Sequence, residues 1–327
     1  MNGETRATAV AHVNVALVKY WGKRDAELVI PWTSSLSMTL DAFYTTTSVR
    51  FVAEPGDDEV VLNGAPVTGV PRQRVTAFLD LVRTRTGRTG KALVDSENTV
   101  PTGAGLASSS SGFAALALAA SSACGVELDA TALSRLARRG SGSASRSVFG
   151  GFALWHAGHD DESSYAEPVE SPGFDPVMVV ALVDTAHKSV NSRDAMRRTV
   201  ETSPLFRPWA DSAPADLKEM RAAVERADLD AVGEITERNA LGMHATMLAA
   251  RPAVRYFAPA TVSALDAVLA LRRAGISAYA TMDAGPNVKV LCRRADADAV
   301  AEAVHAAAGC PTAVAGAGPA ARLLVAP

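Results

Sequence analysis

The chain has 327 residues and a formal net charge of −3, with 48% hydrophobic and 20% charged residues. These values are typical of a globular protein with one large or two ordinary domains, and the slightly acidic balance argues against nucleic acid as the main partner. We expect no membrane span, because no apolar stretch reaches about eighteen residues, and no signal peptide, because the N-terminus has no long apolar stretch after a basic start. The cytoplasm is the default compartment. Three widely separated cysteines argue against a disulfide framework and a zinc site.

The first half of the sequence predicts a sheet accompanied by helices. Alternating apolar residues at 8–18, and β-branched and aromatic residues at 35–54, favour strands. Residues 55–67 predict a hairpin with Asn63 and Gly64 at its turn. The other elements predicted in this half are a helix at 72–87, a strand at 91–100, a helix at 111–125 and a helix at 129–142 that Asp129 caps.

The second half of the sequence is richer in helix. Its predicted strands lie at 150–155, 177–184 and 321–327, with a hairpin at 276–292. Its predicted helices lie at 192–203, 214–248 (as two helices), 263–275 and 295–309. Because strands and helices mix without regular alternation, we predict an α+β fold. The change from a β-rich to a helix-rich half predicts a domain boundary near residues 184–190.

A loop of small residues, TVPTGAGLASSSSG at 99–112, precedes an apolar helix. The free N–H groups and positive dipole end of that helix would point back at the loop, where glycine permits close approach of a phosphate. The serine hydroxyls could also reach a magnesium ion. The loop is not a Walker motif, since no lysine follows the second glycine, and Ser108 occupies the third glycine position of a dinucleotide fingerprint. A tight turn between helix and sheet is an equally good interpretation of the loop alone.

Two further segments place cations near small residues. VKYWGKRD has Lys19 and Lys23 four residues apart, where they either face a phosphorylated ligand or flank a packed Trp21. ARRGSGSASRS at 137–147 offers backbone N–H groups, hydroxyls and Arg146, whose planar guanidinium suits bidentate contact with phosphate. A surface loop is the alternative for this segment. Two candidate anion sites in one chain favour an enzyme that joins two phosphorylated ligands.

One acidic residue, Asp283, lies in the turn MDAGPN between two apolar strands. A carboxylate there could act as a base or as an electrostatic group. An ordinary hairpin turn also favours Asp, Gly and Asn, and taken alone the segment is better explained as a turn. The six histidines are scattered without triad spacing, so we interpret most of them as structural or exposed.

Four segments, in the same order, resemble the ATP-dependent mevalonate diphosphate decarboxylases of the GHMP kinase superfamily. The segments are NVALVKYWGKRDAELVIPWTSSLSMTL, TVPTGAGLASSSSGFAALA, ARRGSGSASRSVFGGF and AYATMDAGPNVKVL. A fifth, HKSVNSRDAMRRTVETSPLF, is similar to the stretch that opens the second half of the family. KYWGK and SGSASR are specific to the decarboxylase branch, whereas the glycine-serine loop identifies only the superfamily. The match spans residues 12 to about 291.

The resemblance implies an α+β, two-domain GHMP kinase fold with the active site in the cleft between the halves. The N-terminal half, residues 1–186, would be ribosomal protein S5 domain 2-like, and the C-terminal half, residues 187–327, would be ferredoxin-like. A homodimer acting in the mevalonate pathway of isoprenoid biosynthesis is implied. ATP, with Mg²⁺, would phosphorylate the 3-hydroxyl of (R)-5-diphosphomevalonate, and loss of that phosphate with CO2 would give isopentenyl diphosphate and ADP.

The resemblance also implies roles for individual residues. Asp283 would orient or deprotonate the 3-hydroxyl, Lys19 would lie beside the reacting groups, and Arg146 would clamp the carboxylate or phosphates. The implied substrate-binding residues are Tyr20, Trp21, Gly22, Lys23, Arg74, Ser141, Gly142, Ser143, Ala144, Ser145, Arg146, Ser192 and Thr202. The implied nucleotide-binding residues are Pro101, Gly103, Gly105, Leu106, Ala107, Ser108, Ser109, Ser110 and Lys188, with Ser108 also assigned to magnesium.

Three positions depart from the family's pattern. Thr33 stands where Asn is common, Ser145 stands where many members have Cys, and His187 replaces one residue of a common lysine pair, leaving Lys188 alone. None of these changes removes the implied catalytic acid at Asp283.

Two alternative functions stay open at this point. A kinase or decarboxylase could act on mevalonate or mevalonate 5-phosphate, although the presence of both Asp283 and Lys19 disfavours a pure kinase, and Lys23 and Arg74 favour a diphosphate. A noncatalytic nucleotide-binding protein that kept the fold is the other alternative, and it would have no need of a reactive carboxylate in the cleft.

Overall fold

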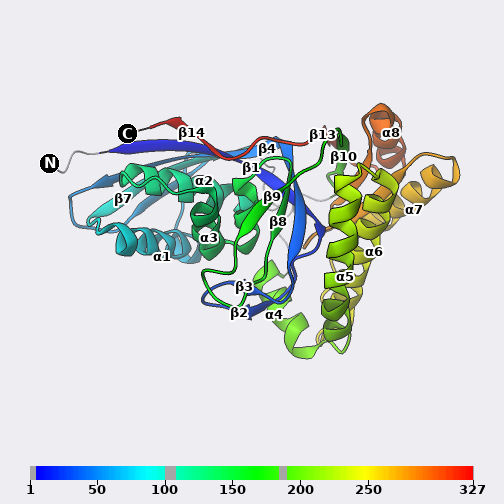
Figure 1. Cartoon of the computed structure of the whole chain (residues 1–327), viewed down its shortest axis with the longest axis horizontal. Helices are drawn as coiled ribbons and strands as arrows, with labels where there is room; N and C mark the ends of the chain where they lie inside the picture. The colour runs from blue at the N-terminus through cyan, green and yellow to red at the C-terminus, as the bar shows by residue number, and fades with distance from the viewer. Residues whose placement is uncertain (1–4, 100–107, 184–189, 327) are drawn as a thin grey trace.

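The structure is a computed structural model that describes residues 5–99, 108–183 and 190–326. Two sheets form the framework, and helices pack against both of them (Figure 1). Six of the residues predicted to bind the nucleotide lie outside the described residues, as does His187: Pro101, Gly103, Gly105, Leu106, Ala107 and Lys188.

The larger sheet occupies the N-terminal part of the molecule. Its strands are β1 (Arg6–Val18), β4 (Ser35–Val52), β5 (Glu59–Leu62), β6 (Ala65–Pro66), β7 (Lys91–Asn98), β8 (Phe152–Trp155), β9 (Ala166–Val169) and β14 (Arg322–Val325). They run in the order β14-β1-β4-β7-β5-β6, while β8 pairs with the first residues of β4 and with β9. The helices α1 (Gly69–Thr86), α2 (Ser108–Ala123) and α3 (Ala130–Gly140) lie on one face of this sheet (Figure 1).

The smaller sheet is antiparallel throughout, in the order β11-β12-β10-β13. Its strands are β10 (Pro176–Ala181), β11 (Ala278–Met282), β12 (Val288–Arg293) and β13 (Thr312–Ala315). Two helices, α7 (Pro259–Arg273) and α8 (Ala297–Ala308), pack against it through a buried apolar cluster. Together with the larger sheet, this arrangement confirms the predicted α+β class.

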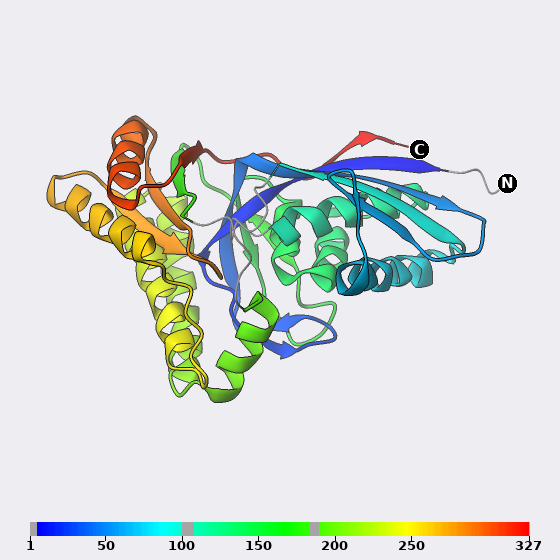
Figure 2. The ribbon, with the colours of Figure 1, turned by 180° about the vertical axis from the view of Figure 1, so that it is seen from behind.

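Three helices connect the two sheets. They are α4 (Ser192–Thr202), α5 (Phe206–Glu225) and α6 (Leu229–Leu248). Helix α6 contacts both β1 and β11, and one buried cluster contains residues of β1, β4, α5 and α6. Both views show α4 on the same side of the molecule as the short hairpin of β2 (Lys23–Asp25) and β3 (Ile30–Pro31) (Figure 2). These contacts place the ends of β1 and β11 close together.

Most predicted elements are present, with some differences at their ends. Residues 35–52 form one long strand, and the predicted turn at Asn63 and Gly64 joins β5 to β6. Helix α5 begins eight residues before Pro214, where we predicted its start, because the apolar side chains of its first turns are buried and outweigh the proline inside the helix. The short strands of the β2–β3 hairpin, β9 and β13 were not predicted, since two to four residues carry too little pattern.

Sheet membership does not follow a division at residue 187. Strand β10, before that point, belongs to the smaller sheet, and β14, near the C-terminus, pairs with β1 of the larger sheet. Strands β1 and β14 therefore lie side by side (Figure 1). The boundary between residues 186 and 187 stays a prediction.

None of the described helices is both long and apolar enough to cross a membrane. All three cysteines are free thiols.

Asp129 caps α3 as predicted, because its carboxylate accepts a hydrogen bond of 2.7 Å from the Ala132 N–H. We expect Asp129→Ala to lower the free energy of unfolding by about 0.5–2 kcal/mol, since the first turn loses a partner for one of its free N–H groups. Denaturant unfolding measures the change. Asp129→Asn is the matched control, because its side-chain oxygen can still accept this bond, and a loss as large as that of the alanine variant would contradict the capping role.

Candidate active site

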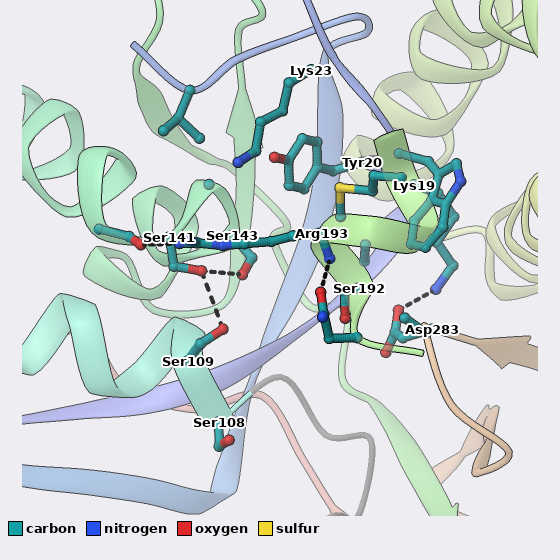
Figure 3. A pocket seen from close by; sticks show the side chains of 18 of the residues that line it. Lys19, Tyr20, Lys23, Ser108, Ser109, Ser141, Ser143, Ser192, Arg193 and Asp283 are labelled. Atoms are coloured by element: carbon teal, nitrogen blue, oxygen red, sulfur yellow. Dashed lines mark hydrogen bonds and ion pairs between the residues drawn. The ribbon is translucent and has the colours of Figure 1, made fainter. Parts of the chain in front are cut away.

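A cavity of about 570 Å³ lies where the ends of β1 and β11 meet α2, α3 and α4. Its described lining contains predicted catalytic, substrate-binding and nucleotide-binding residues. Figure 3 draws 18 of the lining residues and labels ten. The predicted residues that line the cavity are Lys19, Tyr20, Trp21, Lys23, Arg74, Ser108, Ser109, Ser141, Gly142, Ser143, Arg146, Ser192 and Asp283. Segments distant in the sequence therefore converge on a single cavity.

Asp283 and two lysines form an ion cluster in the cavity wall. Lys19 directly follows β1, Asp283 directly follows β11, and the distance from Lys19 Nζ to Asp283 Oδ1 is 2.7 Å. Lys289, on β12, lies 3.1 Å from Asp283 Oδ2 through its Nζ. Both lysine side chains are almost fully buried, whereas that of Asp283 is 21% exposed and faces the cavity. The carboxylate can therefore meet a ligand while both ammonium groups hold it.

This cluster keeps the carboxylate ionised. Burial raises the pKa of Asp283, but attraction and hydrogen bonding from Lys19 and Lys289 outweigh it, so the pKa lies well below its usual value. Burial lowers the pKa of Lys19 to about 8, against the attraction of Asp283. Such a low carboxyl pKa suits a group that orients a hydroxyl or stabilises positive charge better than one that stores a proton.

A hydrogen bond from α6 fixes the backbone at Lys19. The Lys19 N–H donates to Asn239 Oδ1 over 2.8 Å, and the Asn239 side-chain N–H donates to Asp216 Oδ2 over 2.8 Å. Arg238 holds the other oxygen of Asp216 at 2.9 Å. The end of β1 is thereby attached to α5 and α6, which positions the Lys19 ammonium beside Asp283.

Arg146 is held rigidly in the cavity wall. It lies on the 3₁₀ helix η1 (Gly142–Val148) and is 2% exposed. Its Nε and Nη2 donate to Asn14 Oδ1 over 3.4 and 3.3 Å, and its Nη1 donates to the Ser35 hydroxyl. The guanidinium also lies 5.8 Å from the ring centre of Trp155. Burial lowers the pKa of Arg146 to about 10, so it remains cationic at neutral pH and can bind a carboxylate or phosphate.

A second group of cations lines another part of the cavity. Arg74 and Arg193 both donate to the Gly140 carbonyl, over 3.5 and 3.3 Å. Lys23 lies near both, and its pKa is lowered to about 8 by burial and by repulsion from Arg193 and Arg74. Among the described residues no carboxylate forms an ion pair with any of these three cations. This unbalanced positive charge makes the region a strong site for a multiply charged anion.

Gly140 matters because the chain must pass close to a core aromatic ring. A Cβ atom added there would lie 2.0 Å from Phe113, which is too close for any side chain. Glycine therefore allows α3 to end against α2 and presents the Gly140 carbonyl to the two arginines.

Ser108, Ser109, Ser141 and Ser143 lie on the side of the cavity opposite Asp283 (Figure 3). Ser108 and Ser109 begin α2 and are exposed, and the Ser109 hydroxyl lies 3.2 Å from that of Ser141. The first turn of α2 therefore directs its free N–H groups and positive dipole end toward the same space as two hydroxyls. Such an arrangement fits phosphate.

Five predicted residues are not among the described residues that line the cavity: Gly22, Ser110, Ala144, Ser145 and Thr202. Ser110, Ala144 and Ser145 are fully buried, and the Ser145 hydroxyl donates to the Gly142 carbonyl over 2.8 Å. Thr202 is the last residue of α4. Its hydroxyl donates a hydrogen bond of 2.7 Å to the Arg198 carbonyl and accepts one of 2.7 Å from the Arg251 N–H. These residues shape the surrounding structure, and their binding roles stay predictions.

Sequence reasoning missed Asn14, Arg193 and Lys289. Each left a weak signal: Asn14 interrupts an apolar strand, Lys289 interrupts the apolar run VKVLC, and Arg193 directly follows the predicted Ser192. Thr33, a departure from the family's pattern, is buried and its hydroxyl has no hydrogen-bond partner among the described residues.

The two sheets, the helices between them and a cavity lined by cations and a helix N-terminus define a two-domain protein of the GHMP kinase class. Residues 11–166 match the family model of the diphosphomevalonate decarboxylase-like N-terminal domain. Residues 178–317 match that of the mevalonate 5-diphosphate decarboxylase C-terminal domain. The chain therefore belongs to the diphosphomevalonate decarboxylase family.

Individual relatives agree with this assignment. Diphosphomevalonate decarboxylase mvd1 of Aspergillus fumigatus is 37% identical, over 93% of this chain and 81% of its own. Phosphomevalonate decarboxylase of Haloferax volcanii is 33% identical, over 91% of this chain and 92% of its own. A solved structure described as MDDEF in complex with MVAPP, AMPPCP and magnesium is 45% identical, with a TM-score of 0.94 over 98% of this chain and 99% of its own. The relatives thus differ in the number of phosphates that their names give to the substrate.

Proposed function

We propose that the protein catalyses the ATP-dependent decarboxylation of (R)-5-diphosphomevalonate to isopentenyl diphosphate, with release of ADP, phosphate and CO2. The observation that carries this proposal is the placement of Asp283 and Lys19 in the same cavity as two separate anion-binding regions. One region contains Lys23, Arg74 and Arg193, and the other is the N-terminus of α2. The reaction needs one region for each phosphorylated reactant.

The substrate would lie between the cations and the acid. Lys23, Arg74 and Arg193 would bind its diphosphate, Arg146 would bind its carboxylate, and Asp283 would accept a hydrogen bond from its 3-hydroxyl. A related solved structure is described as a complex with MVAPP, AMPPCP and magnesium, which supports a site that takes both ligands. We propose the same arrangement here.

ATP would enter over the first turn of α2. Ser108 and Ser109 offer oxygen atoms there, and Mg²⁺ prefers oxygen ligands and is commonly held through phosphates with few protein ligands. Among the residues that the structure describes, no group of three His, Cys, Asp or Glu side chains could hold a metal by itself, so these hydroxyls fit a metal that arrives with the nucleotide. Bound Mg²⁺ would neutralise charge on the phosphates.

Phosphorylation solves a leaving-group problem. The oxygen of the tertiary alcohol would form a bond to the γ-phosphorus as the bond to ADP breaks, and its proton would pass along the hydrogen bond to Asp283 and on to water. Phosphate would thereby replace hydroxide as the leaving group. Departure of phosphate develops positive charge at C3, and the electrons of the breaking bond to the carboxylate carbon form the double bond as CO2 leaves. Asp283, ionised and held by two lysines, would stabilise that positive charge.

Purified protein mixed with ATP, Mg²⁺ and one acid at a time tests the proposal. Release of phosphate and CO2 in equal amounts from diphosphomevalonate supports it. ADP with a stable phosphorylated acid would indicate a kinase, and no turnover with any acid would indicate a binding protein. Decarboxylation of mevalonate 5-phosphate in preference would match the Haloferax relative, although three cations at one end of the cavity favour the diphosphate.

We also propose a homodimer. We likewise propose two domains, residues 1–186 and residues 187–327, and a cytoplasmic location.

Substrate affinity should fall as the pH rises above about 8. Lys23 has a pKa lowered to about 8, so its ammonium is present below that pH and is lost above it. We therefore expect KM for the phosphorylated acid to increase on the alkaline side. In Lys23→Arg this increase should shift to higher pH, since arginine stays charged. Lys19 also has a pKa of about 8, and its titration would affect kcat as well as KM. If the alkaline increase in KM stayed at the same pH in Lys23→Arg, the increase would not come from Lys23, and the role of Lys23 would be contradicted.

A further inference from the structure

Lys289 is the second of the two lysines that hold Asp283, and its side chain is buried. It is 1% exposed, lies behind the cavity and is not among the described lining residues. Its Nζ lies 3.1 Å from Asp283 Oδ2 and donates to the Asn287 carbonyl over 3.4 Å. Among the described residues that line the cavity, Asp283 is the one that Lys289 contacts through an ion pair.

The β11–β12 hairpin fixes this geometry. Lys289 pairs in register with Thr281 on one side and with Val180 of β10 on the other, so its backbone lies in the interior of the smaller sheet. A charged group at such a position is costly to bury and persists only with close partners. An apolar residue would pack more easily in this strand, which suggests that the ammonium serves the carboxylate.

The two lysines hold different oxygens of the same carboxylate. Lys19 Nζ lies 2.7 Å from Oδ1, and Lys289 Nζ lies 3.1 Å from Oδ2. Two contacts on opposite oxygens fix the plane of the carboxylate, whereas a single contact would let it rotate. Each oxygen has two lone pairs, so one remains available for a substrate hydroxyl.

Charged and titratable groups reach Asp283 from several elements. They are Lys19 at the end of β1, Lys289 on β12, Arg146 on η1 and His244 on α6. Burial lowers the pKa of His244 to about 4, so this residue is neutral near pH 7. Among the described residues, the positive charge that acts on Asp283 therefore comes from Lys19, Lys289 and Arg146, and the two lysines contact it directly.

We propose that Lys289 is a positioning residue that holds the second oxygen of Asp283, so that the carboxylate stays ionised and oriented toward the substrate hydroxyl. This inference rests on the proposed decarboxylase function.

Lys289→Met removes the charge and keeps a side chain of similar length. We expect kcat to fall about 10- to 100-fold, as for loss of a hydrogen bond to a charged group, with KM for either substrate changed less than about threefold. The acidic limb of the pH profile of kcat should move about one to three units higher, because the carboxylate loses an opposite charge within contact distance. Lys289→Arg retains a cation and should keep the acidic limb near its wild-type position. A thermal unfolding curve verifies that each variant is folded.

A double-mutant cycle separates positioning from structure. If Lys289 acts through Asp283, then Lys289→Met should change kcat little in an Asp283→Asn background. Lys91→Met is the control, since Lys91 is an ion-paired lysine on β7 that is not among the cavity's described lining and its loss should leave kcat unchanged.

The outcomes distinguish this inference from the function on which it rests. An unmoved pH profile in Lys289→Met, or an equal loss of kcat in both backgrounds, would overturn the positioning role while wild-type turnover keeps the function intact. Absence of wild-type turnover on diphosphomevalonate would instead overturn the function and the inference together.

Discussion

Asp283→Asn should lower kcat by about 10²–10⁴-fold and leave ATP affinity nearly unchanged. The carboxylate faces the cavity beside Lys19, whereas the α2 N-terminus that would hold the nucleotide lies on the opposite side. An amide has almost the same shape but carries no charge, so it could not stabilise positive charge at C3. The loss should therefore appear in turnover more than in binding.

The substitution also leaves two buried ammonium groups without their counter-ion. Asp283 raises the pKa of Lys19, so its removal should favour the neutral amine, and some loss of stability is expected. Turnover is measured as phosphate and CO2 release, and ATP binding by calorimetry. Asp175→Asn is the matched control, because this exposed aspartate pairs with Arg294 and does not line the cavity. Near-native turnover of a folded Asp283→Asn protein would refute the role of the carboxylate.

Individual strands and helices were predictable from the sequence where the periodic pattern of apolar residues extended over many positions. The apolar alternation of β1 and the helical spacing of α3 with its Asp129 cap each predicted an element that is present. The pairing of β14 with β1 could not be predicted, because four exposed residues at the end of the chain give no sign of a partner more than 300 positions away. Long-range pairing depends on the whole chain and not on a local pattern.

The sequence predicted which motifs contribute residues to the site, but it did not predict how those residues contact one another. Segments containing Lys19, Arg146 and Asp283 each had an ordinary alternative when taken alone, and only their common order pointed to one site. The structure adds the partners of the predicted residues: Asn14 and Ser35 hold Arg146, and Lys289 holds Asp283. A buried polar residue inside an apolar strand is the sequence signal for such partners, because burial without a partner is costly.

Arg146→Lys should mainly weaken binding of the phosphorylated acid. Three nitrogens of the guanidinium donate to Asn14 and Ser35, which fixes its plane. Lysine presents one flexible ammonium and cannot reproduce these contacts together with a bidentate contact to a carboxylate. Truncating a buried, hydrogen-bonded charge pair costs roughly 2–5 kcal/mol, which corresponds to about a 30-fold to several-thousand-fold loss in kcat/KM.

Arg294→Lys is the control for that experiment. Arg294 also forms a two-bond contact with a carboxylate, at 2.7 and 2.6 Å from Asp175, but both side chains are exposed. Exposed pairs contribute little, so this variant should keep native kcat and KM. If Arg146→Lys changed neither kinetic constant, its guanidinium would not bind the substrate. If it lowered kcat with KM unchanged, Arg146 would act on the transition state and not on binding, because uniform binding affects KM alone.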